Sequence, residues 1–261
     1  MHTLGFLGFG QMAAAMADGW RHADLQEQWT FYASAAHPNA LKKRASAHGV
    51  IALPDNAALV ASSDIIIIAV KPYLVRNLLE PLKDALKGKI IVSIAADLSY
   101  QDYRNFLSDE THVWSTLPNT PMAIGHGVLV AEAETNLQTE ELELVTNLFR
   151  SIAQIITVPA EKKSIAGTLS GCGPAFISLA IEALADAGVK YGLPRQTAYQ
   201  LVSSMIEGTA ALQQATQTHP GIMKDQVTSP GGTTIRGICA LEEYGFRNAL
   251  IKAVDAIEGG E

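Results

Sequence analysis

Residues 3–13 of the chain read TLGFLGFGQMA, and this stretch decides the fold. The apolar run Thr3–Leu7 is predicted to form a β-strand, and the sequence that follows, Gly8-Phe9-Gly10-Gln11-Met12-Ala13, opens a helix expected over Gln11–His22. A GxGxxA pattern between strand and helix allows a tight turn and lets the backbone approach a pyrophosphate at the helix N-terminus. The stretch therefore predicts a dinucleotide-binding βαβ unit, and a turn that needs two glycines for its own sake is the alternative.

Short β-rich runs alternate with helix-length amphipathic stretches up to about residue 160. Several runs are apolar without alternation, as is typical of strands that crossover helices cover on both faces. The pattern predicts a doubly wound, Rossmann-type α/β domain over residues 1–160. A second helix is expected after Pro38, and the expected strands are Thr3–Leu7, Thr30–Ala33, Ile65–Val70, Ile90–Ile94, His112–Thr116, Val128–Ala131 and Ile155–Val158.

Residues 161–261 have a different character. No strand is expected between Lys162 and Ile257, and the pattern there is helical. The stretch Ala175–Ala187 is apolar nearly all round, so its helix must be buried on more than one side. A small helical tail has little room to bury that surface alone, and we expect a second subunit to cover it. The expected helices are Pro174–Lys190, Pro194–Gln214, Ile222–Val227, Thr233–Glu243 and Phe246–Ile257.

The composition excludes several classes of protein. The chain has 261 residues, 48% hydrophobic and 17% charged, and its 26 acidic and 19 basic side chains give a net charge of −7 that would repel nucleic acid. Cys172 and Cys239 form no CxxC motif and have no histidine at ligand spacing, so neither a disulfide framework nor a metal site is expected. No Lys or Arg precedes Arg21 and no aliphatic run is long enough to span a bilayer. The sequence favours a soluble, cytoplasmic protein without nucleic-acid or membrane partners.

The end of the second predicted strand bears on the choice of cofactor. A site that prefers NAD carries Asp or Glu there, about 20 residues after the glycines, to bind the ribose hydroxyls. This chain has Ala33-Ser34 instead, followed by a short polar tip and then by Lys42, Lys43 and Arg44. Such an end could accept a 2′-phosphate, which favours NADP, although the three cations could equally form a solvated helix face.

Three further strand ends are expected at the same crevice, because ligands in open α/β sheets bind outside the carboxyl ends of the strands. They are Ala69-Val70-Lys71-Pro72, Ser93-Ile94-Ala95-Ala96 and Leu117-Pro118-Asn119-Thr120-Pro121. Lys71 could be a catalytic cation, or a helix-start residue whose backbone touches the cofactor. The proline-bracketed turn could be a wall beside the nicotinamide or an interdomain turn.

The stretch at 224–234, KDQVTSPGGTT, is the most informative one outside the cofactor domain. A Pro-Gly-Gly before a helix leaves several backbone N–H groups open at a positive dipole end, which suits a substrate carboxylate. Ser229, Thr233 and Thr234 add hydroxyl groups. A capping turn is the alternative.

Two other arrangements are not interpreted as catalytic. Glu182 and Asp186 lie four residues apart on one helical face, which favours a polar seam or an interface contact over an acid/base pair. The seven histidines show no HExxH pattern, and Ser170-Gly171-Cys172-Gly173-Pro174 precedes a helix without the strand of a nucleophile elbow. We therefore expect no nucleophile and no metal.

Six motifs together resemble the Δ1-pyrroline-5-carboxylate reductase family, which makes proline by reducing a cyclic imine with NAD(P)H. They are GFGxM at 8–12, AVKP at 69–72, PNTP at 118–121, GCGPAF at 171–176, EALADAGVKYGLPR at 182–195 and HPGIMKDQVTSPGGTTIRG at 219–237. The resemblance spans nearly the whole chain, and TSPGGTT is far more specific than the dinucleotide fingerprint. The chain departs from the family pattern at Ser115, where Arg is usual, and at Cys172, where Ser or Ala is common.

The resemblance implies a role for each matching position. The substrate carboxylate would bind Ser229 and the backbone of Gly231, Gly232 and Thr233, and the hydroxyl of Thr234, the catalytic group, would lie near the ring nitrogen. The cofactor would be NADPH, with NADH as the alternative. Its expected contacts are Phe6, Leu7, Gly8, Phe9, Gly10, Gln11, Met12, Ser34, Asn56, Ala69, Val70, Lys71, Pro72, Ala95 and Ala96.

The resemblance also implies the reaction and the assembly. Its members reduce (S)-1-pyrroline-5-carboxylate to L-proline, the last step of proline biosynthesis, and dimerise through the all-helical C-terminal domain. We expect a homodimer, with a decamer of dimers as a further assembly. Two rival interpretations are a β-hydroxyacid dehydrogenase, for which Lys190 is the nearest candidate for a catalytic lysine, and a non-catalytic nucleotide-binding protein.

Overall fold

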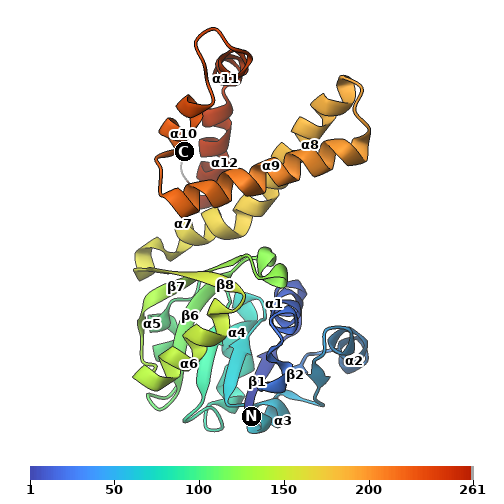
Figure 1. Cartoon of the computed structure of the whole chain (residues 1–261). Helices are drawn as coiled ribbons and strands as arrows, with labels where there is room; N and C mark the ends of the chain where they lie inside the picture. The colour runs from blue at the N-terminus through green and yellow to red at the C-terminus, as the bar shows by residue number, and fades with distance from the viewer. Residues whose placement is uncertain (260–261) are drawn as a thin grey trace. The chain divides into compact units, whose positions relative to one another are not determined.

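The computed structural model describes residues 1–259 and divides the chain into two compact units, Met1–Gly171 and the residues from Cys172 onward (Figure 1). The sequence places the division after residue 160. The intervening segment comprises the 3₁₀ turn η4 (Ala160–Lys162), the helix α7 (Lys163–Gly167) and the π-helical turn η5 (Thr168–Cys172). It falls almost wholly in the first unit, where the Lys163 side chain is buried.

The first unit contains one eight-stranded sheet in the order β3-β2-β1-β4-β5-β6-β7-β8. All pairs from β3 through β6 are parallel, whereas β7 is antiparallel to β6 and β8 is parallel to β7. The strand order reverses between β1 and β4, the type of position at which doubly wound sheets bind ligands. The strands are β1 (His2–Leu7), β2 (Trp29–Ser34), β3 (Ile51–Ala52), β4 (Ile65–Ile68), β5 (Ile90–Ser93), β6 (His112–Pro118), β7 (Gly127–Thr135) and β8 (Ala153–Val158).

Helices of the first unit begin at residues that suit a first turn. Pro38 and Pro72 open α2 and α4, where a missing N–H costs nothing, and the Asp55 carboxylate accepts a hydrogen bond from Ala58 N to cap α3. Ser99 and Asp102 form a capping box at α5. The helices are α1 (Gln11–His22), α2 (Pro38–Ala47), α3 (Asn56–Ser62), α4 (Pro72–Leu79), α5 (Tyr100–Arg104), α6 (Thr139–Arg150) and α7, with 3₁₀ turns η1 (Leu25–Glu27), η2 (Glu80–Leu82), η3 (Thr120–Ile124) and η4.

Alternating side chains of the central strands enter two separate cores, one on each face of the sheet. On β4, Ile65 and Ile67 belong to the core that includes Trp20 of α1, whereas Ile66 and Ile68 belong to the core beneath α3, α4 and α5. All four isoleucines are fully buried. This two-sided burial explains why the strand is an unbroken apolar run rather than an alternating one.

The expected fold class is confirmed, and each expected strand of the first unit is present with ends shifted by a few residues. Two features were not anticipated. The strand β3 has only two residues, too few for a sequence pattern, and β7 and β8 run against the other six strands. Strand direction depends on the connection between strands, and β6 and β7 are joined by a short segment rather than by a crossover helix.

The second unit is helical throughout its described residues. It contains α8 (Gly173–Lys190), α9 (Arg195–Thr216), α10 (Pro220–Gln226), α11 (Thr233–Glu243) and α12 (Phe246–Glu258), close to the five predicted helices. Helices α8 and α9 pack against each other (Figure 1). Only Ala185 and Ala198 are buried among the described residues of this unit, and large apolar side chains such as Leu179 and Leu201 are exposed.

Candidate active site

The predicted cofactor contacts of the first unit gather at one edge of the sheet. Parallel pairing places Ser34, Leu7, Ile68, Ser93 and Ser115 in one row across β2, β1, β4, β5 and β6. Backbone hydrogen bonds continue past this row from Gly8 N to Ser34 O (2.9 Å), from Ala69 N to Leu7 O (2.9 Å) and from Ile94 N to Ile68 O (3.2 Å). The turns after β1, β4 and β5 therefore emerge side by side, as the sequence predicts.

The two glycines of the β1–α1 turn have different roles. Gly8 has φ +88°, and a Cβ there would lie 2.7 Å from Ala69 O, so the turn itself requires glycine at this position. Gly10 has an ordinary φ of −89°, and a Cβ there would meet no atom within 4 Å. Nothing in the fold requires glycine at position 10, and the open space suits a group that approaches the backbone.

The N-terminus of α1 faces that open space with unpaired donors. Gly10 is its N-cap residue, no side chain caps the helix, and no acidic side chain lies in its first turn. The first amides of a helix without a cap are free to bind an anion, and the helix dipole favours negative charge there. The geometry therefore fits the pyrophosphate of a dinucleotide.

The other predicted residues of the fingerprint differ in accessibility. Phe6 and Leu7 are fully buried and fill the cores beneath the turn, and Phe9 is 6% exposed. Gln11 is exposed and Met12 is half-buried. At this edge, Phe6 and Leu7 support the turn, while the backbone from Gly8 to Met12 borders the space above it.

Ser34 and Asn56 are brought together from separate elements. Ser34 ends β2 and is 1% exposed, and its hydroxyl donates to Oδ1 of Asn56, the first residue of α3, over 2.7 Å. No carboxylate ends β2, and Lys42 and Lys43 are exposed on α2. The structure thus keeps both expectations for these lysines open, a 2′-phosphate site and a solvated helix face.

The turns after β4 and β5 present mainly backbone. Lys71 is exposed at the N-cap position of α4, and Ala69, Val70 and Pro72 are half-buried. After β5, Ala95 N donates to the Ser93 hydroxyl (3.2 Å), which also contacts the Tyr103 hydroxyl at 2.5 Å. Burial raises the pKa of Tyr103, so that its hydroxyl stays protonated and holds Ser93 in place. Ala95 is buried and Ala96 is exposed at the edge.

The proline-bracketed turn is held from within the first unit. Asn119 is 5% exposed, its Oδ1 accepts a hydrogen bond from Val128 N (2.8 Å), and its Nδ2 donates to Ser170 O (3.0 Å). These bonds fix the start of η3 against β7 and the end of the unit. The Asn119 side chain is therefore committed to the turn itself.

The predicted carboxylate seat is a tight turn in the second unit. Gly232 N donates to Ser229 O (3.0 Å), Gly231 has φ +69°, and a Cβ on Gly232 would lie 2.5 Å from the Ser229 hydroxyl oxygen. Gly232 is the N-cap of α11 and supplies no side-chain cap. Ser229, Thr233 and Thr234 are exposed, so this helix N-terminus carries open amides and accessible hydroxyls, as expected.

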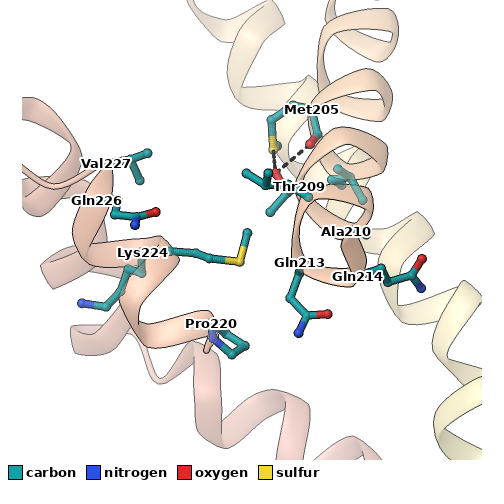
Figure 2. Close-up of a pocket in the computed structure, with 12 residues that line it drawn as sticks. Met205, Thr209, Ala210, Gln213, Gln214, Pro220, Lys224, Gln226 and Val227 are labelled. Carbon is teal, nitrogen blue, oxygen red and sulfur yellow. Dashed lines mark hydrogen bonds between the residues drawn. The ribbon is translucent and has the colours of Figure 1, made fainter. Parts of the chain in front are cut away.

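A mainly apolar hollow of about 670 Å³ lies between α9 and α10 in the same unit (Figure 2). Met205, Ile206, Met223 and Val227 line it, and the Thr209 hydroxyl donates to the Met205 carbonyl of its own helix (2.8 Å). The hollow includes Lys224 and Gln226 from the informative stretch but none of the residues Ser229–Thr234. It therefore differs in position and in chemistry from the carboxylate seat.

Asp186 and Lys190, which the sequence offers as candidate catalytic residues, contact other side chains of the second unit. Asp186 of α8 pairs with Arg195 of α9, which agrees with a structural role for that carboxylate. Lys190 is exposed and lies 5.8 Å from the centre of the Tyr191 ring. Among residues 1–259, no group of three or more His, Cys, Asp or Glu side chains is arranged to hold a metal ion. The sequence analysis did not single out Lys163 and Glu132, which form a buried ion pair in the first unit.

The difference between the two glycines predicts the effect of substituting each one. Gly10→Val should weaken NADPH binding by about 100-fold, or about 2.8 kcal/mol, because the branched side chain fills the space that the pyrophosphate needs. The midpoint of urea unfolding should not change, since no atom lies near the new Cβ. Gly8→Val is the matched control and should lower that midpoint. Tight NADPH binding by folded Gly10→Val protein would refute the assignment.

Comparison with known proteins identifies the family. Residues 3–97 match the family described as NADP oxidoreductase, coenzyme F420-dependent, and residues 161–259 match pyrroline-5-carboxylate reductase dimerisation. Pyrroline-5-carboxylate reductases of Treponema pallidum and Glycine max are 41% and 38% identical to the chain; the alignments cover 97% and 98% of this chain and 98% and 93% of those proteins. The crystal structure of Plasmodium falciparum pyrroline carboxylate reductase with NADP bound is 30% identical, with a TM-score of 0.87, and covers 98% of this chain and 95% of that chain. The chain therefore belongs to the pyrroline-5-carboxylate reductase family.

Proposed function

We propose that this protein reduces (S)-1-pyrroline-5-carboxylate to L-proline with NADPH, the last step of proline biosynthesis. The observation that carries the cofactor part is the open space at Gly10, which lies at an uncapped helix N-terminus where the strand order reverses. The names of the relatives supply the substrate, and the Plasmodium falciparum structure contains NADP.

The cofactor site of this proposal lies on the first unit. The backbone of Gly8–Met12 would bind the pyrophosphate, and Ser34 and Asn56 would face the ribose of the adenine half. The absence of a carboxylate at the end of β2 supports NADPH over NADH, because a carboxylate would repel the 2′-phosphate. Residues of the β4 and β5 turns, 69–72 and 95–96, would border the remainder of the molecule.

The substrate site of this proposal lies on the second unit. The open amides at the start of α11, with the Ser229 hydroxyl, would bind the substrate carboxylate, because both donors and dipole favour an anion. The hydroxyl of Thr234 would hydrogen-bond the ring nitrogen. Gly231 and Gly232 give the turn its shape, since the first has a positive φ and the second has no room for a Cβ.

The proposed reaction does not need a side chain that acts as a strong acid or base. NADPH, when bound, supplies the hydride for the imine carbon, and a protonated iminium is the better acceptor. As that carbon is reduced, the ring nitrogen gains a lone pair, to which the Thr234 hydroxyl can donate. The chain then contributes placement of the substrate and a hydrogen bond that strengthens in the transition state.

The β-hydroxyacid dehydrogenase alternative needs a lysine aimed at its substrate, and Lys190 does not suit this role. Its ammonium group is exposed and lies over the ring of the neighbouring Tyr191. A non-catalytic nucleotide-binding protein would not need the turn at Ser229–Gly232. Turnover of pyrroline-5-carboxylate therefore separates the proposal from both rivals.

One experiment tests the reaction and the cofactor preference together. Purified protein is assayed with pyrroline-5-carboxylate and either NADPH or NADH, in wild type, Ser34→Asp and Ser34→Asn. We expect wild type to prefer NADPH. Ser34→Asp should lower the NADPH/NADH ratio of kcat/KM at least about tenfold relative to Ser34→Asn. Ser34→Asn is the control because Asn has nearly the same shape as Asp and carries no charge. Equal ratios in the two variants would contradict the placement of Ser34, and absence of turnover in wild type would refute the reaction.

Thr234→Val tests the proposed hydrogen bond to the ring nitrogen. Val keeps the shape of Thr, and the proposed carboxylate donors are backbone amides and the Ser229 hydroxyl, which the substitution leaves in place. We therefore expect kcat to fall about 10- to 1000-fold, or about 1.5–4 kcal/mol, with a smaller change in KM. Thr234→Ser should restore most of the rate. A rise in KM alone would assign Thr234 to ground-state binding, and an unchanged kcat would show that the nitrogen is managed without it.

We propose further that the second unit pairs with a second copy of the chain in the cytoplasm, with a decamer of dimers as a higher assembly. The family match at 161–259 is to a dimerisation region, and α8 and α9 expose apolar side chains that a partner would cover. The helical stretch 160–190 is also long and apolar enough to cross a membrane by length and composition alone. A partner helix suits it better, because Glu182 and Asp186 interrupt its surface and Asp186 pairs with Arg195.

Sedimentation at several concentrations tests this assembly. Wild type should sediment as a dimer or a multiple of it, and Leu179→Glu, on the exposed face of α8, should shift the protein toward monomer. Ile124→Glu is the matched control, because Ile124 and Leu179 are both 68% exposed but Ile124 lies in the first unit. Its sedimentation should match wild type. Monomeric wild type that co-floats with lipid vesicles would instead support a membrane partner.

A further inference from the structure

The Lys163–Glu132 pair lies at the centre of a buried polar cluster in the first unit. Lys163 begins α7 and is 5% exposed, and Glu132 of β7 is fully buried. The ammonium of Lys163 donates to Leu98 O (2.5 Å), the Ser115 hydroxyl (2.5 Å) and Glu132 Oε2 (3.3 Å). All three of its N–H donors have partners.

Each hydrogen-bond partner of Lys163 either lies in the segment between β5 and α5 or is itself hydrogen-bonded at the end of that segment. The Ser115 hydroxyl donates to Leu98 O as well (2.7 Å), so that this one carbonyl accepts two hydrogen bonds. Glu132 Oε2 also accepts from Tyr100 N (3.0 Å), at the start of α5. The cluster therefore fixes the distal end of the segment 94–99, while Ser93 fixes its proximal end through Ala95 N.

The segment has a conformation that needs such restraint. Asp97 has φ +63°, in the left-handed region, which Asp adopts more readily than most residues other than glycine but still at some cost. Strained residues persist where surrounding contacts determine the backbone more than once. The residues just before it, Ala95 and Ala96, are the two that border the proposed cofactor site.

Burying an ion pair costs desolvation free energy, so a fold gains little stability by holding a loop in this way. Burial lowers the pKa of Lys163, and the neighbouring Glu132 carboxylate opposes that shift. Apolar residues of similar volume would often stabilise a fold at least as well as such a pair. The pair is therefore better explained by what it positions than by its contribution to stability.

We propose that Lys163 is a positioning residue for the reduction: through Leu98 and, by way of Glu132, through Tyr100, it holds Ala95 and Ala96 in register with the nicotinamide half of NADPH. This inference rests on the proposed cofactor site. Lys163 itself touches neither cofactor nor substrate in this scheme. Its removal should disturb the nicotinamide half and leave the adenine half of the site unchanged.

The decisive variant is the double substitution Lys163→Met/Glu132→Gln, because it removes both charges together and leaves no buried charge unpaired. Lys163→Met alone should unfold at lower urea concentration, since Glu132 would lose its counter-ion. The double variant should recover much of that stability and still lack the ammonium that holds Leu98. Val145→Ala, in the buried face of α6, is the control for a loss of stability far from the segment 94–99.

Three measurements on these variants test the proposal. Amide hydrogen exchange of residues 94–100 in the cofactor-free protein should accelerate at least tenfold in the double variant and stay unchanged in Val145→Ala. The Kd of adenosine 2′,5′-bisphosphate should change less than twofold. With pyrroline-5-carboxylate and saturating NADPH, kcat should fall at least tenfold in the double variant, with the pyrroline-5-carboxylate KM changed less than threefold.

Three results would overturn the proposal. Unchanged exchange at 94–100 in the double variant would show that Lys163 does not hold the segment. A loss of affinity for adenosine 2′,5′-bisphosphate as large as the loss of kcat would show a general structural effect. The exchange measurement needs no substrate, so it distinguishes failure of this inference from failure of the proposed reaction. Faster exchange with an unchanged kcat would also overturn it, because the segment would then not position the nicotinamide.

Discussion

The close approach of the β1–α1 turn to the end of β4 is the constraint on which the first unit depends. With φ +88° and 2.7 Å between a hypothetical Cβ and the Ala69 carbonyl, only glycine at position 8 lets β1 pass into α1 beside β4. Parallel pairing of β1 with β4 and of β4 with β5 aligns the ends of these strands, and the alignment brings three separate turns to one edge of the sheet. The same backbone path then leaves Gly10 beside open space at an uncapped helix N-terminus. One glycine makes the turn possible, and the other keeps the space beside it free.

The elements that could be predicted from the sequence are those whose physics is local. The helix α1 has the expected bounds, because the glycines before it and the apolar face after it are both visible in the pattern. The apolar run at 65–68 predicts a strand covered on both faces, and both cores are present. The reversed direction of β7 and β8 depends on a connection that no periodicity reveals. The two-residue strand β3 owes its existence to pairing with β2 alone.

The residues of the candidate site differ in the same way: some could be predicted from the local sequence, and others depend on tertiary contacts. Gly8, Gly10, Gly231 and Gly232 could be singled out because glycine signals either a backbone requirement or a close approach. The geometry shows a backbone requirement at Gly8, Gly231 and Gly232, and open space at Gly10. The hydrogen bond between Ser34 and Asn56 joins residues of β2 and α3. The end of the second predicted strand pointed to Ser34, whereas only the resemblance to a family suggested Asn56. Lys163 gives no signal in the sequence, because lysine at the start of a helix is normally solvated. Its burial follows from where α7 packs against β6 and β7, which is a property of the tertiary structure.

The unequal burial of the two units has a consequence for how the protein is made. The first 171 residues contain two complete hydrophobic cores, so a nascent chain can fold this unit while the rest is still being synthesised. The helices that follow bury only two alanines among their described residues and display leucines and isoleucines to water. In a newly synthesised chain the first unit has therefore buried its apolar side chains, while the second unit still exposes an apolar surface. An exposed apolar surface of this kind favours aggregation for as long as nothing covers it.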